Sequence, residues 1–246
     1  MKQILPTNWK TGIGVGVVAI VVAAVAYAGV VRDGSEAVAE EIGQAAQAEK
    51  QRIVDALADG GTFEMEVAAY SERQEFPGDL IPEFMQVPHR IERIWMTVDD
   101  SGTIQESGAT ISDESGTVLA TAIDTGTHRV FTAPDGETFE FPAATAKGQS
   151  LFAWLDGTFE QLTHMLQAGD GFTKTGTSTL AGMDSIVLER EQSGVPGGPD
   201  VRLEYEVAEE DPLIFRASTF ERRDGEEVLV RETVVLSYDV APTGNE

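Results

Sequence analysis

Hydrophobic and polar residues alternate along most of the chain from residue 62 onward. Phe63, Met65 and Val67 are separated by Glu64 and Glu66, a period of two that is typical of a strand with one buried face. Ten later segments show similar alternation, so we expect eleven strands. The ten segments are residues 90–98, 103–112, 118–123, 128–132, 137–141, 172–180, 184–191, 201–207, 213–220 and 227–238.

Short segments rich in Gly, Asp, Ser and Pro separate these strands. Residues 100–102 (DSG), 114–116 (ESG) and 134–136 (PDG) have compositions typical of tight turns. Short turns join antiparallel neighbours, whereas parallel strands need long crossovers. The pattern therefore predicts a mainly β protein with an antiparallel meander, and not a βαβ fold.

A helical pattern precedes the strands, in residues 35–58. Ser35 is a suitable N-cap, and Gly60 and Gly61 end the helix. Two interpretations stay open: a stalk that packs loosely on the β-domain, or a helix that covers one end of a cavity in the sheet. The apolar positions near 3.6-residue spacing are Val38, Ile42, Ala45, Ala46, Ile53, Val54 and Leu57.

A second helical pattern, in residues 149–168, interrupts the strands. Gly157 lies in its middle, so we expect two short helices, the second starting at Thr158. The apolar face requires burial, and the concave side of a curved sheet is the natural place for it. This face consists of Leu151, Phe152, Leu155, Phe159, Leu162 and Leu166.

The N-terminal residues 11–31 contain no charged side chain. A helix of this length spans roughly 30 Å of hydrocarbon. Lys2 and Lys10 precede the segment, and this lysine bias keeps the N-terminus in the cytoplasm. We therefore expect a single-pass signal anchor that leaves the C-terminal domain outside the membrane. The alternative is a signal peptide cleaved after Ala28, which would secrete the same domain.

These patterns divide the chain into five parts. Residues 1–10 are a cytoplasmic N-terminus and 11–31 the membrane span, followed by an amphipathic stalk at 32–60. The β-domain occupies 61–240, with the helical insertion inside it, and 241–246 form a polar tail.

Charge excludes one large class of function. The chain has 17 basic and 42 acidic residues, a net charge of −25. Residues 1–31 hold two of the lysines and no acid, so the remainder carries 15 basic against 42 acidic side chains, or −27. Such a field repels phosphate backbones, and we expect no nucleic-acid partner.

No motif in the sequence indicates catalysis or metal binding. The chain has no cysteine, which excludes disulfides, thiolate chemistry and a lipidated cysteine. Its histidines, His89, His128 and His164, lack the spacing of metal ligands. Nucleotide-binding loops and hydrolase motifs are absent from the sequence too. We therefore expect no enzyme, no metal and no cofactor.

Three stretches resemble a known superfamily. They are DTGTHRVF at 124–131 leading to PDG at 134–136, then GTSTLAGMDSIVL at 176–188, and the turn EDPLIFR at 210–216. Together with the element order, they resemble lipoprotein carriers and receptors of the LolA and LolB type. Relatives of that superfamily include mycobacterial envelope lipoproteins and the protein RseB.

The resemblance implies an unclosed β-barrel whose apolar cavity, under a helical lid, binds a lipid or a lipoprotein acyl group. The alternative is an envelope sensor or scaffold that binds a protein partner through the β-domain. The candidate lining residues also have an ordinary interpretation as core packing. They are Phe63, Met65, Val67, Trp95, Phe131, Phe139, Phe141, Phe152, Leu155, Phe159 and Met165.

The segment 76–88 is an apolar loop between the first two expected strands. Three prolines, at positions 77, 82 and 88, exclude a regular helix or a central strand. The loop is either a flap over the mouth of a cavity or part of the core. Its apolar candidates for a flap are Leu80, Ile81, Phe84 and Met85.

Overall fold

The computed structural model describes residues 34–72, 87–142, 145–160, 162, 166, 171–192 and 200–243. The membrane span expected at 11–31, the alternative cleavage site after Ala28 and the flap residues Leu80, Ile81, Phe84 and Met85 lie outside these ranges. Within the ranges, no helix combines the length and the apolar composition needed to cross a membrane.

All eleven strands expected from the alternation are present, together with two helices in the described residues. The elements are α1 (Gly34–Ala56), β1 (Gly61–Ser71), β2 (His89–Val98), β3 (Ile104–Ser112), β4 (Val118–Asp124), β5 (His128–Thr132), β6 (Thr138–Pro142), α2 (Leu151–Thr158), β7 (Thr173–Leu180), β8 (Met183–Gln192), β9 (Val201–Ala208), β10 (Phe215–Arg223) and β11 (Glu226–Pro242).

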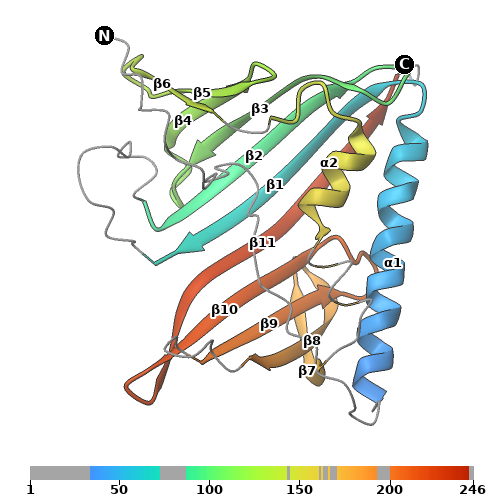
Figure 1. Ribbon diagram of the computed structural model, residues 1–246, viewed down its shortest axis with the longest axis vertical. Coiled ribbons are helices and arrows are strands. Elements are labelled where there is room, and N and C mark those ends of the chain that lie inside the picture. Colours follow the sequence, from blue (N-terminus) through green and yellow to red (C-terminus); the bar gives the residue numbers. More distant parts are fainter. Residues whose placement is uncertain are drawn as a thin grey trace. The chain divides into compact units, whose positions relative to one another are not determined.

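The strands form one antiparallel sheet in the order β6-β5-β4-β3-β2-β1-β11-β10-β9-β8-β7 (Figure 1). Every pair of neighbours except β1 and β11 is consecutive in the chain, as expected when short turns connect the strands. In the described part of the chain, β6 and β7 are the two edges, so the sheet is open. The expectation of a mainly β, antiparallel and unclosed architecture is confirmed.

The chain divides into two compact units, and β11 contributes to both. Among the described residues, the first unit contains Ile53–Trp154 and the residues from Tyr238 onward. The second contains residues 34–52 and Leu155–Ser237. Each unit has strands that pack against apolar side chains of its own.

The two turns that flank β3 share one sequence and one geometry. Each begins with an aspartate, Asp99 or Asp113, followed three residues later by glycine with positive φ, 74° at Gly102 and 83° at Gly116. The aspartate Oδ1 accepts hydrogen bonds from the backbone N–H groups and one hydroxyl inside the turn, at 2.6–3.0 Å. The sequence D-x-S-G-T thus closes both hairpins.

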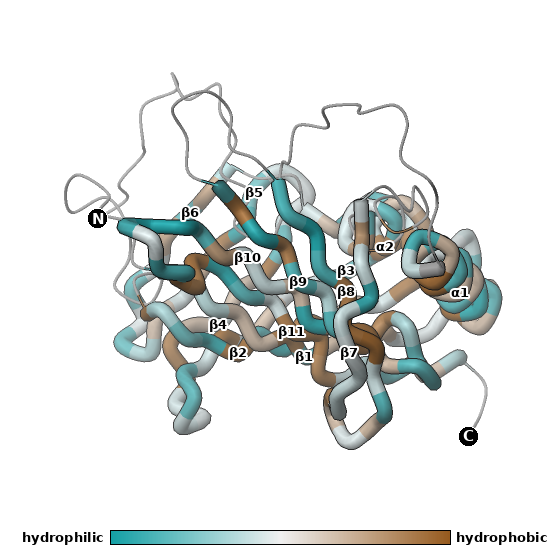
Figure 2. The backbone as a smooth tube through the Cα atoms, turned by 90° about the horizontal axis from the view of Figure 1, so that it is seen from below, coloured by the Kyte–Doolittle hydropathy of each residue, from teal (hydrophilic) through white to brown (hydrophobic). Residues whose placement is uncertain are grey.

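The apolar stripe of α1 agrees with the predicted one at Ala46, Ile53 and Leu57, and differs from it in the N-terminal half of the helix, where Ala39 and Gly43 are buried in place of Val38 and Ile42. The buried positions repeat every three or four residues, as in a helix with one covered side. The buried positions in the N-terminal half of the helix are small residues, and the charged Lys50 is buried among the apolar ones that follow. All the buried positions of the stripe are Ala39, Gly43, Ala46, Lys50, Ile53 and Leu57. The hydrophilic residues of α1 lie along the other side of the helix (Figure 2).

The helical insertion begins as expected, because α2 starts at Leu151. Gly157 does not break the helix: it lies in the last turn, and α2 continues to Thr158. Most of the second expected helix lies outside the described residues, although Leu162 and Leu166 are described and buried.

Candidate functional site

One face of β1–β6 carries six of the predicted lining residues, and we call it the apolar face. The hydrogen-bonded register aligns side chains of all six strands in two neighbouring rows. The first row is Met65, Ile94, Ala109, Ala122, Phe131 and Phe139. The second row is Phe63, Met96, Ser107, Asp124, Arg129 and Phe141.

The aromatic residues of the apolar face pack closely. Phe63 is 0% exposed and lies 5.9 Å from the ring of Trp154 and 6.2 Å from that of Tyr238. Phe131 and Phe141 meet edge to face at 5.4 Å, a favourable arrangement for aromatic pairs. Val67 lies beyond the two rows on the same face and is also buried.

Trp95 lies on the opposite face, which corrects its place among the lining residues. In the register it is opposite Glu64 and Gly108, whereas its neighbours Ile94 and Met96 point to the apolar face. A Cβ on Gly108 would come within 2.8 Å of the Trp95 ring, so the indole lies flat over a residue without a side chain. The prediction that Trp95 points inward is therefore wrong, because Ile94 and Met96 are the β2 residues on the apolar face.

A buried ion pair lies within the second row of the apolar face. Arg129 donates to both carboxylate oxygens of Asp124, from Nε at 2.6 Å and from Nη2 at 3.1 Å. The Ser107 hydroxyl and the Ala146 backbone N–H also donate to Asp124 Oδ2, at 2.7 and 3.3 Å. Asp124 is 2% exposed and Arg129 is 8% exposed. With four donors and an opposite charge, this carboxylate meets the conditions under which buried charge is tolerated.

Thr145 lies beside this ion pair along the chain. It precedes Ala146, whose N–H bonds to Asp124, and its carbonyl accepts a hydrogen bond of 2.7 Å from the Gln149 side chain. Its hydroxyl oxygen is buried and has no hydrogen-bond partner in the described structure. Buried polar groups without partners are uncommon in folded proteins.

The other predicted lining residues do not join the apolar face. Leu155 and Phe159 are buried in the second unit, where Phe159 meets Phe215 edge to face at 6.1 Å. Phe152 is 41% exposed, because the buried side of α2 carries Leu151 and Leu155 instead. Met165 lies outside the described residues.

The sheet of the second unit has one apolar and one charged face. In its register Leu188, Tyr205 and Ala217 form a buried row. On the same side Phe172 packs edge to face with Tyr205 at 5.7 Å. Burial raises the pKa of the Tyr205 phenol to about 12, against a smaller lowering by the charge of Arg190.

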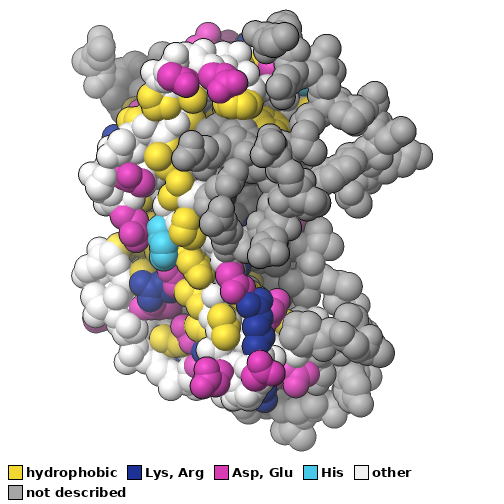
Figure 3. All heavy atoms as spheres, turned by 90° about the vertical axis from the view of Figure 1, so that its left-hand side faces the viewer, with side chains coloured by type: hydrophobic (Ala, Val, Ile, Leu, Met, Phe, Trp, Pro, Cys, Tyr) yellow, Lys and Arg dark blue, Asp and Glu magenta, His cyan; other side chains and the backbone are white. Residues whose placement is uncertain are grey.

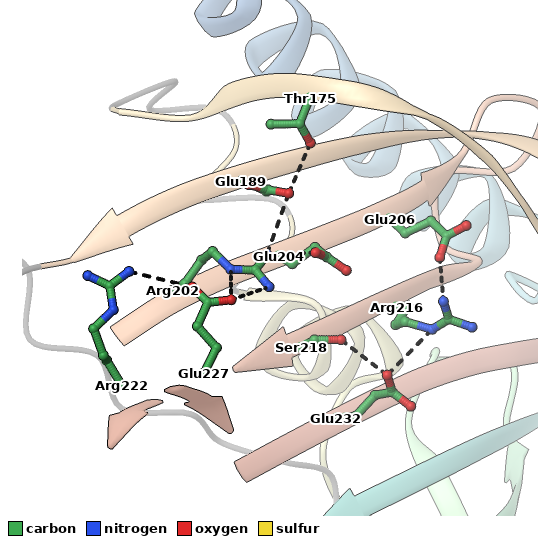
Figure 4. Close-up of polar contacts among 10 residues, drawn as sticks. All are labelled: Thr175, Glu189, Arg202, Glu204, Glu206, Arg216, Ser218, Arg222, Glu227 and Glu232. Carbon is green, nitrogen blue, oxygen red and sulfur yellow. Dashed lines mark hydrogen bonds and ion pairs between the residues drawn. The ribbon is translucent and has the colours of Figure 1, made fainter. Parts of the chain in front are cut away.

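The opposite face of that sheet carries three arginines, Arg202, Arg216 and Arg222, among carboxylates (Figure 4). Arg216 bonds to the buried Glu206 at 2.7 Å and lies 3.6 Å from Glu232. Arg202 bonds to Glu204 at 2.7 Å and stacks on Phe220, with its guanidinium carbon 4.1 Å from the ring centre. Because each guanidinium is already paired with neighbouring carboxylates, these arginines attract an external anion only weakly.

Several opposing effects act on Arg202. Burial by itself lowers the pKa of its guanidinium, because it disfavours the charged form. The hydrogen bond to Glu204 and the charges of Glu227 and Glu189 outweigh this effect, so the pKa is raised above its ordinary value. Arg202 therefore stays charged throughout the physiological pH range.

A shallow, solvent-open groove of about 350 Å³ lies where β2 begins. Val87, Pro88 and His89 form one wall, and the turn at Asp113, which includes Glu114, forms the other. His89 Nδ1 is 3.5 Å from the Glu114 carboxylate, and both side chains are at least half exposed. Among the described residues, no three His, Asp or Glu side chains are arranged to hold a metal ion.

Sequence reasoning missed the Asp124–Arg129 pair, although both residues stand in one of the quoted motifs. The signal was present in the alternation: Ala120, Ala122 and Asp124 share the inward parity of β4. A short turn then places Arg129 opposite Asp124. A charged residue at an inward position, followed by an opposite charge five residues later across a turn, is therefore a usable signal.

Comparison with known proteins found no matching family model and no matching curated protein. Solved structures did match. LprF from Mycobacterium bovis is 12% identical over 82% of this chain and 93% of its own, with a TM-score of 0.43. An uncharacterized conserved protein from Thermus thermophilus is 9% identical over 79% of this chain and 88% of its own, with a TM-score of 0.35.

The Pseudomonas aeruginosa MucA/MucB complex matched as well, at 12% identity over 80% of this chain, with a TM-score of 0.34. The alignment spans 59% of that chain. At these identities and TM-scores, function has to be argued from this chain's own residues.

Proposed function

We propose that this chain is a membrane-anchored, extracytoplasmic binding protein that holds the acyl chain of a lipid or lipoprotein against the apolar face of β1–β6. The uncharged segment 11–31 supports the anchor, and the acidic remainder supports an aqueous location for the domain. Acidic side chains are scattered over the surface in Figure 3. The proposed activity is binding, without a catalytic step.

The observation that carries the proposal is the first row of the apolar face. Six strands contribute one apolar side chain each, and two of the six, Ala109 and Ala122, are small. Apolar ligands bind because hydrocarbon leaves water, at roughly 25 cal/mol per Å² or about 0.8 kcal/mol per methylene. A wall of this composition needs no further chemistry to retain an acyl chain.

The ordinary alternative is that these side chains form a core with no ligand. Native mass spectrometry distinguishes the two. The full chain is extracted from membranes without a delipidation step, and its mass is compared before and after organic extraction. We expect an extractable mass that fragments as an acyl lipid. Protein found only at its own mass would contradict the proposal.

A substitution at the centre of the row sharpens this test. Ala122→Leu adds three carbons where the acyl chain would lie, and we expect it to abolish the extractable mass. If the face is a packed core instead, the same change overpacks it and lowers the free energy of unfolding by about 1–3 kcal/mol. Thr121→Leu, on the opposite face of β4, is the matched control and should retain the lipid.

A second candidate function is a scaffold that binds an envelope protein, and the opposite face of β2–β5 supports it. There Trp95, Gly108, Ile123 and Val130 lie in one row, and Ile123 is 49% exposed. Trp95 and Val130 beside it are partly exposed, and apolar side chains that reach solvent side by side are typical of contact surfaces. A photo-crosslinking residue at position 123 would then trap a partner in cells, and one at the exposed turn residue Asp135 would not.

A further inference from the structure

Two polar groups near the Asp124 ion pair have hydrogen-bonding capacity that the described contacts do not use: Arg129, on the apolar face, and Thr145, which precedes Ala146 in the chain. A guanidinium has five N–H donors. Arg129 uses Nε and one N–H of Nη2 on Asp124, and among the described residues Nη1 has no hydrogen-bond partner. The Thr145 hydroxyl is likewise buried without a partner.

We propose that Arg129 and Thr145 together bind the carbonyl oxygen of an acyl ester, and so hold the polar end of the ligand. This inference rests on the proposed acyl-binding function and names the chemistry at one end of that site. Arg129 supplies spare N–H donors, and Thr145 supplies an O–H donor. An ester carbonyl has two lone pairs and can accept from both.

Charge selects a neutral ester over a carboxylate or phosphate. Asp124 bonds to the guanidinium through both of its oxygens and neutralises it. An incoming anion would therefore meet a cation that is already paired, next to a buried carboxylate and inside a domain of strong negative charge. A carbonyl carries no net charge and avoids this repulsion, while it still gives an acceptor to the Thr145 hydroxyl, which is otherwise buried without a hydrogen-bond partner.

The arrangement also explains a buried ion pair on a lipid-binding wall. Burying a charge pair costs free energy that well-packed apolar residues would not cost. The ion pair would have a function that explains its burial: it orients Arg129, which holds the ester at one position along the face while the acyl chain lies on the apolar rows.

The test compares three ligands of one chain length on the purified full chain. Dodecane, methyl dodecanoate and dodecanoate compete with the neutral fluorescent probe N-phenyl-1-naphthylamine. In the wild type we expect methyl dodecanoate to displace the probe at the lowest concentration. Dodecane reports the apolar wall alone, so its failure to displace the probe would contradict the proposed function itself.

Two variants remove the anchor without removing the ion pair. Thr145→Val deletes the hydroxyl, and Arg129→Lys keeps a positive charge for Asp124 but loses the spare guanidinium donors. Each should weaken methyl dodecanoate binding about 3- to 10-fold, the effect of one neutral hydrogen bond, and leave dodecane unchanged. Thr121→Val and Arg93→Lys, on the opposite face, should leave both ligands unchanged.

The outcomes separate the anchor from packing and from folding. Equal losses for dodecane and the ester would mean that the substitutions disturb the wall, and would overturn the anchor. Tighter binding of dodecanoate than of the ester would overturn the choice of a neutral carbonyl. The urea midpoint of Thr145→Val should equal or exceed that of the wild type, because the lost hydroxyl makes no hydrogen bond in the described structure.

Discussion

At the scale of single residues, the two D-x-S-G-T turns show how one side chain sets a local conformation. The Ser101 hydroxyl and the N–H groups of Thr103 and Ser101 donate to Asp99, and together they lower the pKa of its carboxyl. Asp113 has the same donors in its own turn and a lowered pKa for the same reason. Both turns therefore contribute stability above about pH 4, the ordinary aspartate range, and this stability is lost as the pH falls.

Because the two D-x-S-G-T turns are alike, a substitution in one turn can be tested with the other turn as its control. Ser101→Ala removes the largest contribution to the lowered pKa of Asp99, so that pKa should rise toward its ordinary value. Asp113 should titrate as before, because its turn is untouched. Ser115→Ala should give the reverse pattern. NMR titration of the side-chain carboxyl carbons measures both, and a pKa of Asp99 that does not move in Ser101→Ala would contradict the assignment.

The buried phenol of Tyr205 predicts a loss of stability in alkali. The folded protein holds this proton up to about pH 12, whereas a tyrosine in the unfolded chain titrates near pH 10. The contribution of the protonated phenol to the free energy of unfolding is therefore fully present below about pH 10, and it is lost as the pH rises toward 12. The two-unit difference corresponds to at most about 2–3 kcal/mol.

Urea unfolding between about pH 9 and 12 tests this difference by comparison with Tyr205→Phe. The variant has no phenol to titrate at this position, so its stability should fall less over the window. Tyr70→Phe is the control and should lose as much as the wild type, since it leaves Tyr205 in place. Identical slopes for Tyr205→Phe and the wild type would show that this phenol is not the cause.

At the scale of elements, α1 and α2 are joined by an asymmetric ion pair. Lys50 Nζ lies 2.7 Å from Asp156 Oδ1, and the lysine side chain is 0% exposed while the aspartate side chain is 37% exposed. Removing a partner is costly when it leaves a charge in a buried place, and much less costly when the remaining group reaches water.

The prediction follows from this asymmetry. Asp156→Ala removes the carboxylate that lies 2.7 Å from the buried ammonium, and it should lower the free energy of unfolding by more than Lys50→Met does. Lys50→Met fills the same space with an apolar chain, leaves a carboxylate that water can hydrate, and should cost less than about 1.5 kcal/mol. Urea denaturation measures both. A larger cost for Lys50→Met than for Asp156→Ala would refute this account.

Period-two alternation was sufficient to predict every strand, and turn composition was sufficient to predict that consecutive strands are antiparallel, but neither signal predicted that β1 lies beside β11. Both signals are local, and each strand bordered by a short turn pairs with the next. Alternation did not show which face of β2 is buried. Ile91, Trp95 and Met96 are all apolar, so both faces of that strand carry hydrophobic residues. Burial then depends on the neighbouring strands, which the alternation of one strand does not reveal.

The candidate site was predictable in its apolar part and not in its polar part. Phe63, Phe131 and Phe141 could be assigned from alternation alone. The buried partners of Asp124 come from β3, β5 and the segment after β6, so their meeting depends on the register of three strand pairs. Hydropathy did not predict the N-terminal half of the α1 stripe either, because the small residues Ala39 and Gly43 are buried there, whereas the larger Val38 and Ile42 are only half-buried.

At the scale of the whole molecule, surplus negative charge opposes the folded state. The chain carries 42 acidic against 17 basic residues, and many of the acids lie on the surface (Figure 3). Like charges at this density repel one another across the protein, and salt screens the repulsion. Salt also weakens the exposed ion pairs, but these are fewer than the unbalanced carboxylates.

We therefore expect the urea midpoint to rise between about 10 mM and 0.5 M NaCl, over which the screening length shortens from about 30 Å to less than 5 Å. Choline chloride should give the same rise, since screening depends on ionic strength and not on the cation. A midpoint that falls with salt would show that attractive ion pairs, such as those around Arg202, dominate instead.

The position of β11 has a consequence for how the chain is made. Its end lies beside the start of β1, where the Thr243 N–H bonds to the Gly60 carbonyl at 2.9 Å. Roughly 150 residues separate β1 from β11 in the chain, and such distant pairings form slowly. The sheet therefore stays incomplete until the last strand has been synthesised. During that interval one border of β1 has unpaired backbone groups, and these can pair with a foreign strand until β11 takes its place beside β1.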